Sequence, residues 1–176
     1  AGHLSTSLLP GDPPFAAGGL DQAGAFVLAA AARREAGQPS IAIESISGAA
    51  SERFMRIALI NDDMPFLVDS IAATVAAHGL AIDRLLHPVV AVRRDGSGVL
   101  TEVLDAHAAG EKRESMIYLE TERGDARVRR ALETALAATL ADVRAAVADW
   151  PRMQEAMAAD ADALAAMLND ADGVEV

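Results

Sequence analysis

The stretch "RFMRIALINDDMPFLVDSIAATVAAHG" (residues 53–79) joins a strand pattern directly to a helix pattern. Met55, Ile57 and Leu59 alternate with other residues, as on a strand whose side chains point to opposite faces in turn. From Leu67 onward apolar residues recur every three or four positions, which predicts a helix with one apolar face. We therefore expect a strand that ends at Ile60, a turn at residues 61–63 and a helix that starts near Met64.

The turn carries acids and is followed by a proline, which suits the start of a helix. Asp62 or Asp63 can accept hydrogen bonds from the free backbone N–H groups there, and the helix dipole also favours an acid at this end. Pro65 fits the first helical turn, and Gly79 fits the C-terminal cap. We expect capping to be the main role of the acids. The alternative is that the same amides and carboxylates hold the two ends of a small amino acid.

The segments around this stretch add further elements. Residues 1–19 are rich in Pro, Gly and Ser, which predicts a loose arm. A helix is expected over residues 20–36, with Asp21 as its N-cap and Gly37 ending it. Further strands are predicted in "SIAIESIS" (40–47), in "LAIDRLLHPVVAVRRD" (80–95) as one long strand with a bulge or edge position at Pro88, in "VLTEVL" (99–104) and in "SMIYLETE" (115–122).

The C-terminal third is predicted to be helical. A long helix is expected up to Trp150, with Asp125 near its cap, because large apolar residues recur every three or four positions. Pro151 is expected to break this helix, and a polar, alanine-rich helix should follow over about 152–169. The residues expected to form the core between helix and sheet are Leu132, Leu136, Leu140, Ile57, Leu59, Ile71 and Ile117.

The order of elements from residue 53 is β-α-β-β-(β)-α, which predicts an α+β fold with a ferredoxin-like plan. The sheet should be mostly antiparallel with both core helices on one face, and its return strand is either missing or supplied from elsewhere. We expect an N-terminal arm, helix and short strand over residues 1–50, a folded domain over 51–150, and over 151–176 a helix that leads into the rest of a longer chain. The missing initiator Met also favours a piece of a longer protein.

Composition narrows the classes of function. The formal net charge is −11, which opposes binding to nucleic acid or to an anionic membrane. Only 3% of the residues are aromatic, so few side chains could stack on bases or sugars. The chain contains no cysteine, which excludes disulfides and thiol chemistry, and no apolar run reaches membrane-spanning length. A cytoplasmic location is the default expectation.

Motifs that carry chemistry are absent. The four histidines show no HxH or HExxH spacing, and the chain has no GxSxG, GxGxxG or Walker pattern. His78 is expected to end a helix, and His87 to mark a surface break in a strand. Glu120 and Glu122 share a strand face with no recognisable partner. We therefore expect no catalytic, cofactor-binding or metal-binding residues in this chain.

Three blocks of the sequence carry a family resemblance. They are "NDDMPFLVDSIAATVAAHGLAIDRLLHPVVAVRRDGSG" (61–98), "ESMIYLE" (114–120) and "LADVRAAVADWPRM" (140–153). In this order they resemble the N-terminal region of the very large bacterial NAD-specific glutamate dehydrogenases. The resemblance covers about residues 53–153 and is most specific in the first block.

The resemblance implies an ACT-like module at residues 51–150. Such modules are β-α-β-β-α-β units whose first strand-to-helix turn often contacts an amino-acid effector at a domain interface. The turn more often reads Asp-x-Pro-Gly, whereas this chain has Phe66 after the proline. The residues that the resemblance marks as candidates for effector binding or a domain interface are Asn61, Asp62, Asp63, Met64, Pro65, Phe66 and Ser70.

The resemblance also implies what the parent protein does. The parent would convert L-glutamate, NAD and water to 2-oxoglutarate, ammonia and NADH, and its NAD site would lie outside this chain. The expected partners are the remaining domains of the parent, a second copy in a homo-oligomer, and an amino-acid effector. Three roles compete: an allosteric effector-binding module, a purely structural interaction module, and a free-standing enzyme, which the missing motifs disfavour.

Overall fold

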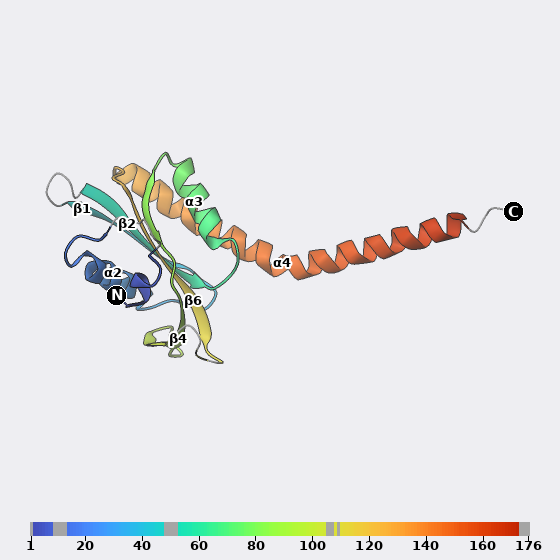
Figure 1. Ribbon diagram of the computed structural model, residues 1–176, viewed down its shortest axis with the longest axis horizontal. Helices are drawn as coiled ribbons and strands as arrows, with labels where there is room; N and C mark the ends of the chain where they lie inside the picture. The colour runs from blue at the N-terminus through green and yellow to red at the C-terminus, as the bar shows by residue number, and fades with distance from the viewer. Residues whose placement is uncertain (1, 9–13, 48–52, 105–107, 109, 173–176) are drawn as a thin grey trace.

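The computed structural model describes residues 2–8, 14–47, 53–104, 108 and 110–172, with side chains described as far as residue 167. The described part is α+β, with a six-stranded sheet between helices (Figure 1). The elements are α1 (Gly2–Ser5), α2 (Gly19–Ala31), β1 (Ser40–Ser47), β2 (Arg53–Asp62), α3 (Leu67–Ala77), β3 (Ile82–Leu86), β4 (Val89–Arg94), β5 (Leu100–Leu104), β6 (Lys112–Glu122) and α4 (Ala126–Asp172).

The sheet is antiparallel, and its long central strands are β2 and β6. The strand order is β1-β2-β6-β4-β5, and β3 also pairs with β6. β1 lies along the outer edge of β2, with Ser40 opposite Ile60 and Ser47 opposite Arg53. This edge is where a β-α-β-β-α-β plan places its last strand. The strand that the sequence left unassigned is therefore supplied by residues 40–47, which come first in the chain.

Each face of the sheet has its own apolar core. On one face, α3 and α4 cover the side chains of Met55, Ile57, Leu59, Ile117 and Leu119. On the other face, α1 and α2 cover Ala58, Ile60, Leu86, Val90, Met116 and Tyr118. Figure 1 shows α3 and α4 on one side of the strands and α2 on the other. The predicted core is confirmed, because all seven of its residues belong to the first cluster.

The N-terminal segment is packed where the structure describes it, so the expectation of a loose arm is wrong there. Leu4 is buried, and the Phe15 ring packs beside Tyr118 with the Arg84 guanidinium over it. α2 follows Gly18, which has a φ of 75°, and ends at Ala31. Asp21 is therefore in the first turn rather than at the N-cap, and Gly37 lies beyond the helix.

The chain leaves α2 early because its next residues bind the turn before β5. The backbone N–H of Arg34 donates to the carbonyl of Gly98. A Cβ on residue 98 would lie only 2.3 Å from the Arg34 carbonyl oxygen, so glycine is needed for this close approach. This contact fixes the side chain of Arg34 at the end of the sheet.

The strand expected over residues 80–95 is two strands, β3 and β4, which both pair with β6. The interruption lies at His87 and Pro88, where the irregularity was predicted. Pro88 has no N–H to donate, but its carbonyl accepts a hydrogen bond from the Met116 N–H at 2.9 Å. The break lets one edge of β6 pair with two short strands in succession.

The turn between β2 and α3 differs from the prediction. β2 continues through Asp62, and α3 begins at Leu67, so Asn61 and Asp62 are strand residues and Pro65 precedes the helix. No side chain caps the N-terminus of α3, so the expected capping by Asp62 or Asp63 is wrong. The reason is that both carboxylates are bound by other side chains. At the other end, Gly79 follows the C-cap His78 with a φ of 72°, as predicted.

α4 is one helix of 47 residues that continues through Pro151, so the predicted break is wrong. Proline removes one intrahelical hydrogen bond and bends a helix, and an exposed helix can tolerate this because water replaces the lost partner. Figure 1 shows α4 bending where it leaves the sheet. Its start is as predicted: Asp125 Oδ1 accepts the N–H groups of Arg127 and Val128. Within the described chain, no helix is apolar over enough residues to span a bilayer.

Candidate functional site

At the end of β2, five charged side chains from separate elements form one network, which we call the arginine–carboxylate network: Arg34, Asp62, Arg94, Glu114 and Arg144. Arg34 follows α2, Arg94 ends β4, Glu114 lies in β6 and Arg144 lies in α4. Three guanidinium groups meet two carboxylates, so the network keeps one positive charge. The network lies at the end of the sheet, between the segment that follows α2 and the helix α4.

Glu114 is the buried centre of this network, with 1% of its surface exposed. Arg94 donates two hydrogen bonds, one to each carboxylate oxygen, both at 2.8 Å. Arg34 donates to Oε1 from Nε at 3.1 Å and from Nη2 at 2.6 Å. Burial would raise the pKa of Glu114, but the hydrogen bonds from Arg94 and Arg34 outweigh it and lower the pKa. Glu114 is therefore held ionised.

Asp62 connects the network to α4. Its Oδ1 accepts from Arg34 Nη2 at 2.6 Å, and its Oδ2 accepts from Arg144 Nη1 at 2.7 Å. Burial acts to raise the pKa of Asp62, and the hydrogen bonds from Arg144 and Arg34 lower it by more. Arg144 Nη2 also donates to Asn61 Oδ1 at 2.6 Å. One helix residue thus binds both of the last two residues of β2.

The sheet register explains why the network needs arginines. Asp62 pairs with Glu114 across β2 and β6. Two like charges in directly opposite positions destabilise a sheet. Arg34 donates to both carboxylates and so compensates this pair. Burial of an unpaired charge would be far more costly, which makes the arginines structural requirements of the register.

A second polar group lies next to the network: Asp63, His87 and Ser115. Ser115 Oγ donates to Asp63 Oδ1 at 3.0 Å, and His87 Nε2 lies 2.9 Å from the same Oγ. Burial lowers the pKa of His87, against the effect of the nearby Asp63. Ser115 is fully buried, and its proton is already donated to a carboxylate. His87 could act as a base, but the Ser115 hydroxyl is buried and already bound to Asp63, so it is not an accessible nucleophile.

Phe66 has an unusual backbone conformation at the N-terminus of α3. Its φ is 69°, in the left-handed region, where it is the one non-glycine residue with positive φ in the described chain. A bulky side chain is strained there. Its ring is 66% exposed. Phe66 follows the proline, at the position where the turn of ACT-like modules more often has glycine, and it presents an apolar ring to solvent.

The seven candidate residues are therefore only partly brought together. Asn61 and Asp62 share Arg144, while Asp63 binds Ser115. Met64 packs against the α3 and α4 core, and the Ser70 carbonyl accepts the Thr74 hydroxyl within α3. Asn61 Nδ2 is the one buried side-chain polar atom without a partner among the described residues. It is a donor that an added acceptor could use.

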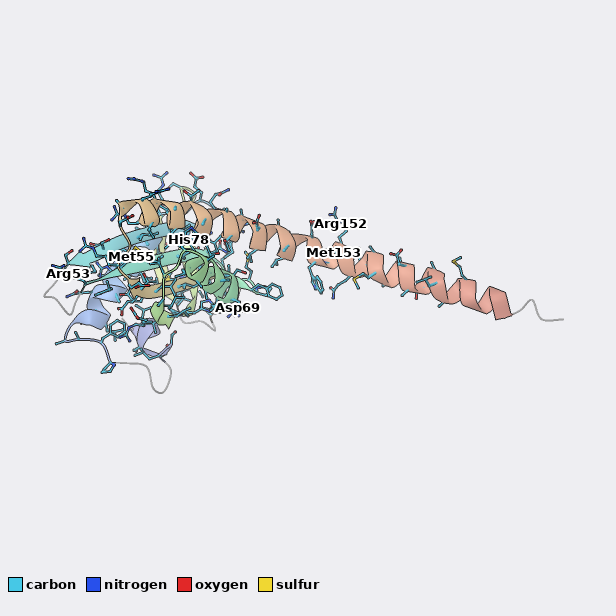
Figure 2. All side chains as sticks on the ribbon, turned by 90° about the horizontal axis from the view of Figure 1, so that it is seen from above. Arg53, Met55, Asp69, His78, Arg152 and Met153 are labelled. Carbon is cyan, nitrogen blue, oxygen red and sulfur yellow. The ribbon has the colours of Figure 1, made fainter. Side chains whose placement is uncertain are left out.

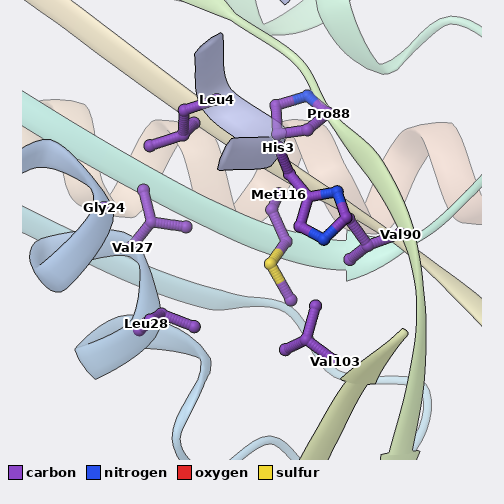
Figure 3. Close-up of a pocket in the computed structure, with 9 residues that line it drawn as sticks. All are labelled: His3, Leu4, Gly24, Val27, Leu28, Pro88, Val90, Val103 and Met116. Carbon is purple, nitrogen blue, oxygen red and sulfur yellow. The ribbon is translucent and has the colours of Figure 1, made fainter. Parts of the chain in front are cut away.

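Two hollows lie away from these residues. An apolar pocket of about 200 Å³ lies between α2 and the sheet; Figure 3 shows the His3 imidazole directed into it, with Met116 and Val103 on its wall. A more polar hollow lies at the start of α4, beside Arg123, Asp125 and Arg129. Neither contains a candidate residue. In the described ranges, no three His, Cys, Asp or Glu residues are placed to hold a metal ion.

The sequence reasoning missed Arg34, Arg94, Glu114 and Arg144. A signal was present for three of them, because Arg94, Glu114 and Arg144 lie in the blocks that carry the family resemblance. The expectation that Glu120 lacks a partner is also wrong, since it accepts hydrogen bonds from Arg84 Nε at 2.9 Å and from the Tyr118 hydroxyl at 2.8 Å. The Arg84–Glu120 pair joins residues 36 positions apart, so local patterns could not reveal it.

Comparisons with known proteins agree with the resemblance. A sequence model of the family "Glutamate dehydrogenase, ACT1 domain" matches residues 20–136. The NAD-specific glutamate dehydrogenase of Pseudomonas aeruginosa is 38% identical over 101 residues, which are 56% of this chain and 6% of that protein. The enzyme of the same name from Halomonas elongata is 35% identical over 101 residues, with the same shares. The matched region is thus about 6% of the length of these curated relatives.

Proposed function

This chain belongs to the family of glutamate dehydrogenase ACT1 domains, and on that basis we propose that it serves as a non-catalytic regulatory and assembly domain of a large NAD-dependent glutamate dehydrogenase. The parent enzyme would convert L-glutamate, NAD and water to 2-oxoglutarate, ammonia and NADH. NAD would bind in the parent, outside this chain. The parent would be a cytoplasmic homo-oligomer, and this domain would contact its other domains.

The observation that carries this proposal is the presentation of Phe66 on a rigid base. The ring is 66% exposed, and the backbone of Phe66 is strained. Four residues earlier, Asp62 at the end of β2 is held by ion pairs with Arg34 and Arg144. Strained, exposed aromatic residues on a fixed scaffold are suited to recognition, because little conformational freedom is lost on binding. The turn is therefore proposed to contact a neighbouring domain of the parent.

The test is Phe66→Ala in the full-length parent enzyme, with Val99→Ala as the matched control. Val99 is also an exposed apolar residue, but it lies before β5. We expect Phe66→Ala to weaken assembly in sedimentation experiments or to reduce the response to amino-acid effectors, and Val99→Ala to change neither. Unchanged assembly and unchanged effector response in Phe66→Ala would contradict this role of the turn.

Amino-acid sensing at the same turn is the second candidate, and it is favoured by the unpartnered Asn61 Nδ2. That donor and the guanidinium of Arg144, whose side chain is 30% exposed, could both bind a carboxylate. Asp63, whose side chain is 28% exposed, could accept from an ammonium group. No described pocket opens here, so a neighbouring domain would have to complete the site.

Sensing is tested by calorimetric titration of the twenty amino acids into the full-length parent and into the 176-residue chain. We expect an effector to bind the parent and Arg144→Gln to abolish binding. A ligand that binds only the folded state also raises the melting temperature, which provides an independent readout. If no amino acid binds the parent, the domain is a purely structural interaction module.

A further inference from the structure

The second half of α4 has no partner within the described chain. Every side chain from residue 148 to residue 167 is exposed, and we call this segment the projecting half of α4. Figures 1 and 2 show it leading away from the sheet, and Figure 2 labels Arg152 and Met153 near its beginning. The first half of the same helix packs on the sheet through Leu132, Leu136 and Leu140.

The projecting half carries an apolar stripe. The stripe consists of Trp150, Met153, Met157, Leu164 and Met167, with exposed fractions from 50% to 69%. Their spacings of three, four or seven residues place them on one side of a helix. The other large apolar residues that are exposed in the described chain, Leu28, Phe66 and Val99, lie on three separate segments.

Five exposed apolar side chains on one side of a helix are expected to be buried by a partner. Isolated helices are only marginally stable in water, and most helices in proteins depend on packing of their apolar face. A contiguous apolar patch on an otherwise polar surface marks a binding surface. Methionine, which supplies three of the five stripe residues, adapts its flexible side chain to a partner.

The charge of the segment indicates the chemistry of the partner. The projecting half has four acids, Asp149, Glu155, Asp160 and Asp162, and one base, Arg152, so its net charge is −3. Arg152 is already paired with Asp149 at 3.1 Å. A second copy of this chain, with its own net charge of −11, would bring like charges together. Charge complementarity therefore favours a basic partner over self-association.

We propose that the stripe docks into an apolar groove with a basic rim on another domain of the same long polypeptide. The helix would insert Trp150, Met157 and Leu164 as anchors, in the way amphipathic helices bind grooves. Asp160 follows Met153 by seven residues and precedes Met167 by seven, so it lies between them on the stripe side of the helix, where a lysine or arginine of the groove would face it. This inference rests on the proposed place of the domain in a long glutamate dehydrogenase, but not on effector binding at the Phe66 turn.

Hydrogen–deuterium exchange tests the proposal, measured on residues 150–167 in the full-length parent and in the 176-residue chain. We expect exchange to be at least about tenfold slower in the parent, because docking must open before the amides exchange. Met157→Glu should restore fast exchange in the parent. Ala159→Glu is the matched control: it adds the same charge on the opposite side of the helix and should leave the protection unchanged.

Two results would overturn the proposal. One is equally fast exchange in the parent and in the 176-residue chain, which would mean that nothing covers the stripe. The other is a dimer of the 176-residue chain in sedimentation that Met157→Glu dissociates and Ala159→Glu does not, which would make a second copy the occupant. Both results are independent of the Phe66→Ala experiment on the turn, so failure of the docking and failure of the regulatory role can be told apart.

Discussion

The two halves of α4 repeat the same helical spacing of large apolar residues, but their surroundings are opposite. Leu132 and Leu136 are fully buried against the sheet, whereas Met157 and Leu164 are more than 60% exposed. Periodicity therefore identifies an apolar face without showing what covers it. The boundary between the halves lies just after Arg144, the helix residue that binds Asn61 and Asp62.

The largest effect is expected in the packed half of α4. Leu136→Ala should lower the free energy of unfolding by roughly 2 to 5 kcal/mol, because it leaves a cavity in place of most of a fully buried side chain. Chemical denaturation of the 176-residue chain measures this. An unchanged denaturation midpoint would mean that the packed half contributes no more to the stability of the fold than the projecting half does.

A smaller loss is expected at the junction of the halves. Arg144→Gln removes the charge that α4 contributes to Asp62, whose side chain is 37% exposed. Hydrogen bonds between charged groups contribute about 1.5 to 3 kcal/mol, and solvent screening reduces this, so we expect a loss of about 1 to 2 kcal/mol. Comparison with Arg152→Gln, which alters an exposed pair in the projecting half, isolates the contribution of the junction.

The network should also make the packed half sensitive to acid. Asp62 and Glu114 have folded-state pKa values below their usual 3.8 and 4.5. Because these pKa values are lowered by folding, the stabilisation is complete above the unfolded values and is lost as the pH falls through the folded ones. Melting curves at decreasing pH should show this loss in the wild type and a weaker dependence in Glu114→Gln. Equal slopes would remove Glu114 from the explanation.

Phe66 should give a gain rather than a loss. Phe66→Gly relieves the positive φ, although glycine raises the entropy of the unfolded chain, so the net gain in stability should be below about 1 kcal/mol. Phe66→Ala keeps the strained backbone and removes the ring. Thermal melting of both variants separates strain from ring packing: Phe66→Gly should be the more stable one, and the reverse order would show that the backbone is not strained.

The smallest effect is expected in the projecting half. Leu164→Ala in the 176-residue chain should change the free energy of unfolding by less than about 0.5 kcal/mol, because the side chain is 62% exposed. Denaturation under the conditions used for Leu136→Ala provides the direct contrast. A loss comparable to that of Leu136→Ala would show that the stripe is already buried in this chain.

Local patterns were sufficient for much of the fold. The strand at Ser40–Ser47, the burial of Ile117 in β6 and the Asp125 cap all follow from neighbouring residues, because alternation and capping are local effects. The predicted break at Pro151 is wrong because a local rule considers only the hydrogen bond that proline removes. An exposed helix can continue through a proline, as α4 does.

The charged site could not be predicted in this way. The Arg34–Glu114 contact spans 80 residues and depends on the register that places Asp62 opposite Glu114. Local chemistry favoured Asp62 or Asp63 as a helix cap. Instead, Asp62 is bound by Arg34 and Arg144, and Asp63 accepts a hydrogen bond from Ser115. Only the packing of α2, β6 and α4 around β2 determines which competing partner binds a carboxylate.

The position of β1 has a consequence for how the domain is synthesised. Because residues 40–47 fill the sheet edge that a C-terminal strand otherwise occupies, every strand of the described sheet has left the ribosome once Glu122 has emerged. Among the described elements, α4 appears last, and its first half closes one core of this sheet. A helix of 47 residues rises about 70 Å, so it can act as a spacer that sets how far the next part of a growing polypeptide lies from the finished sheet.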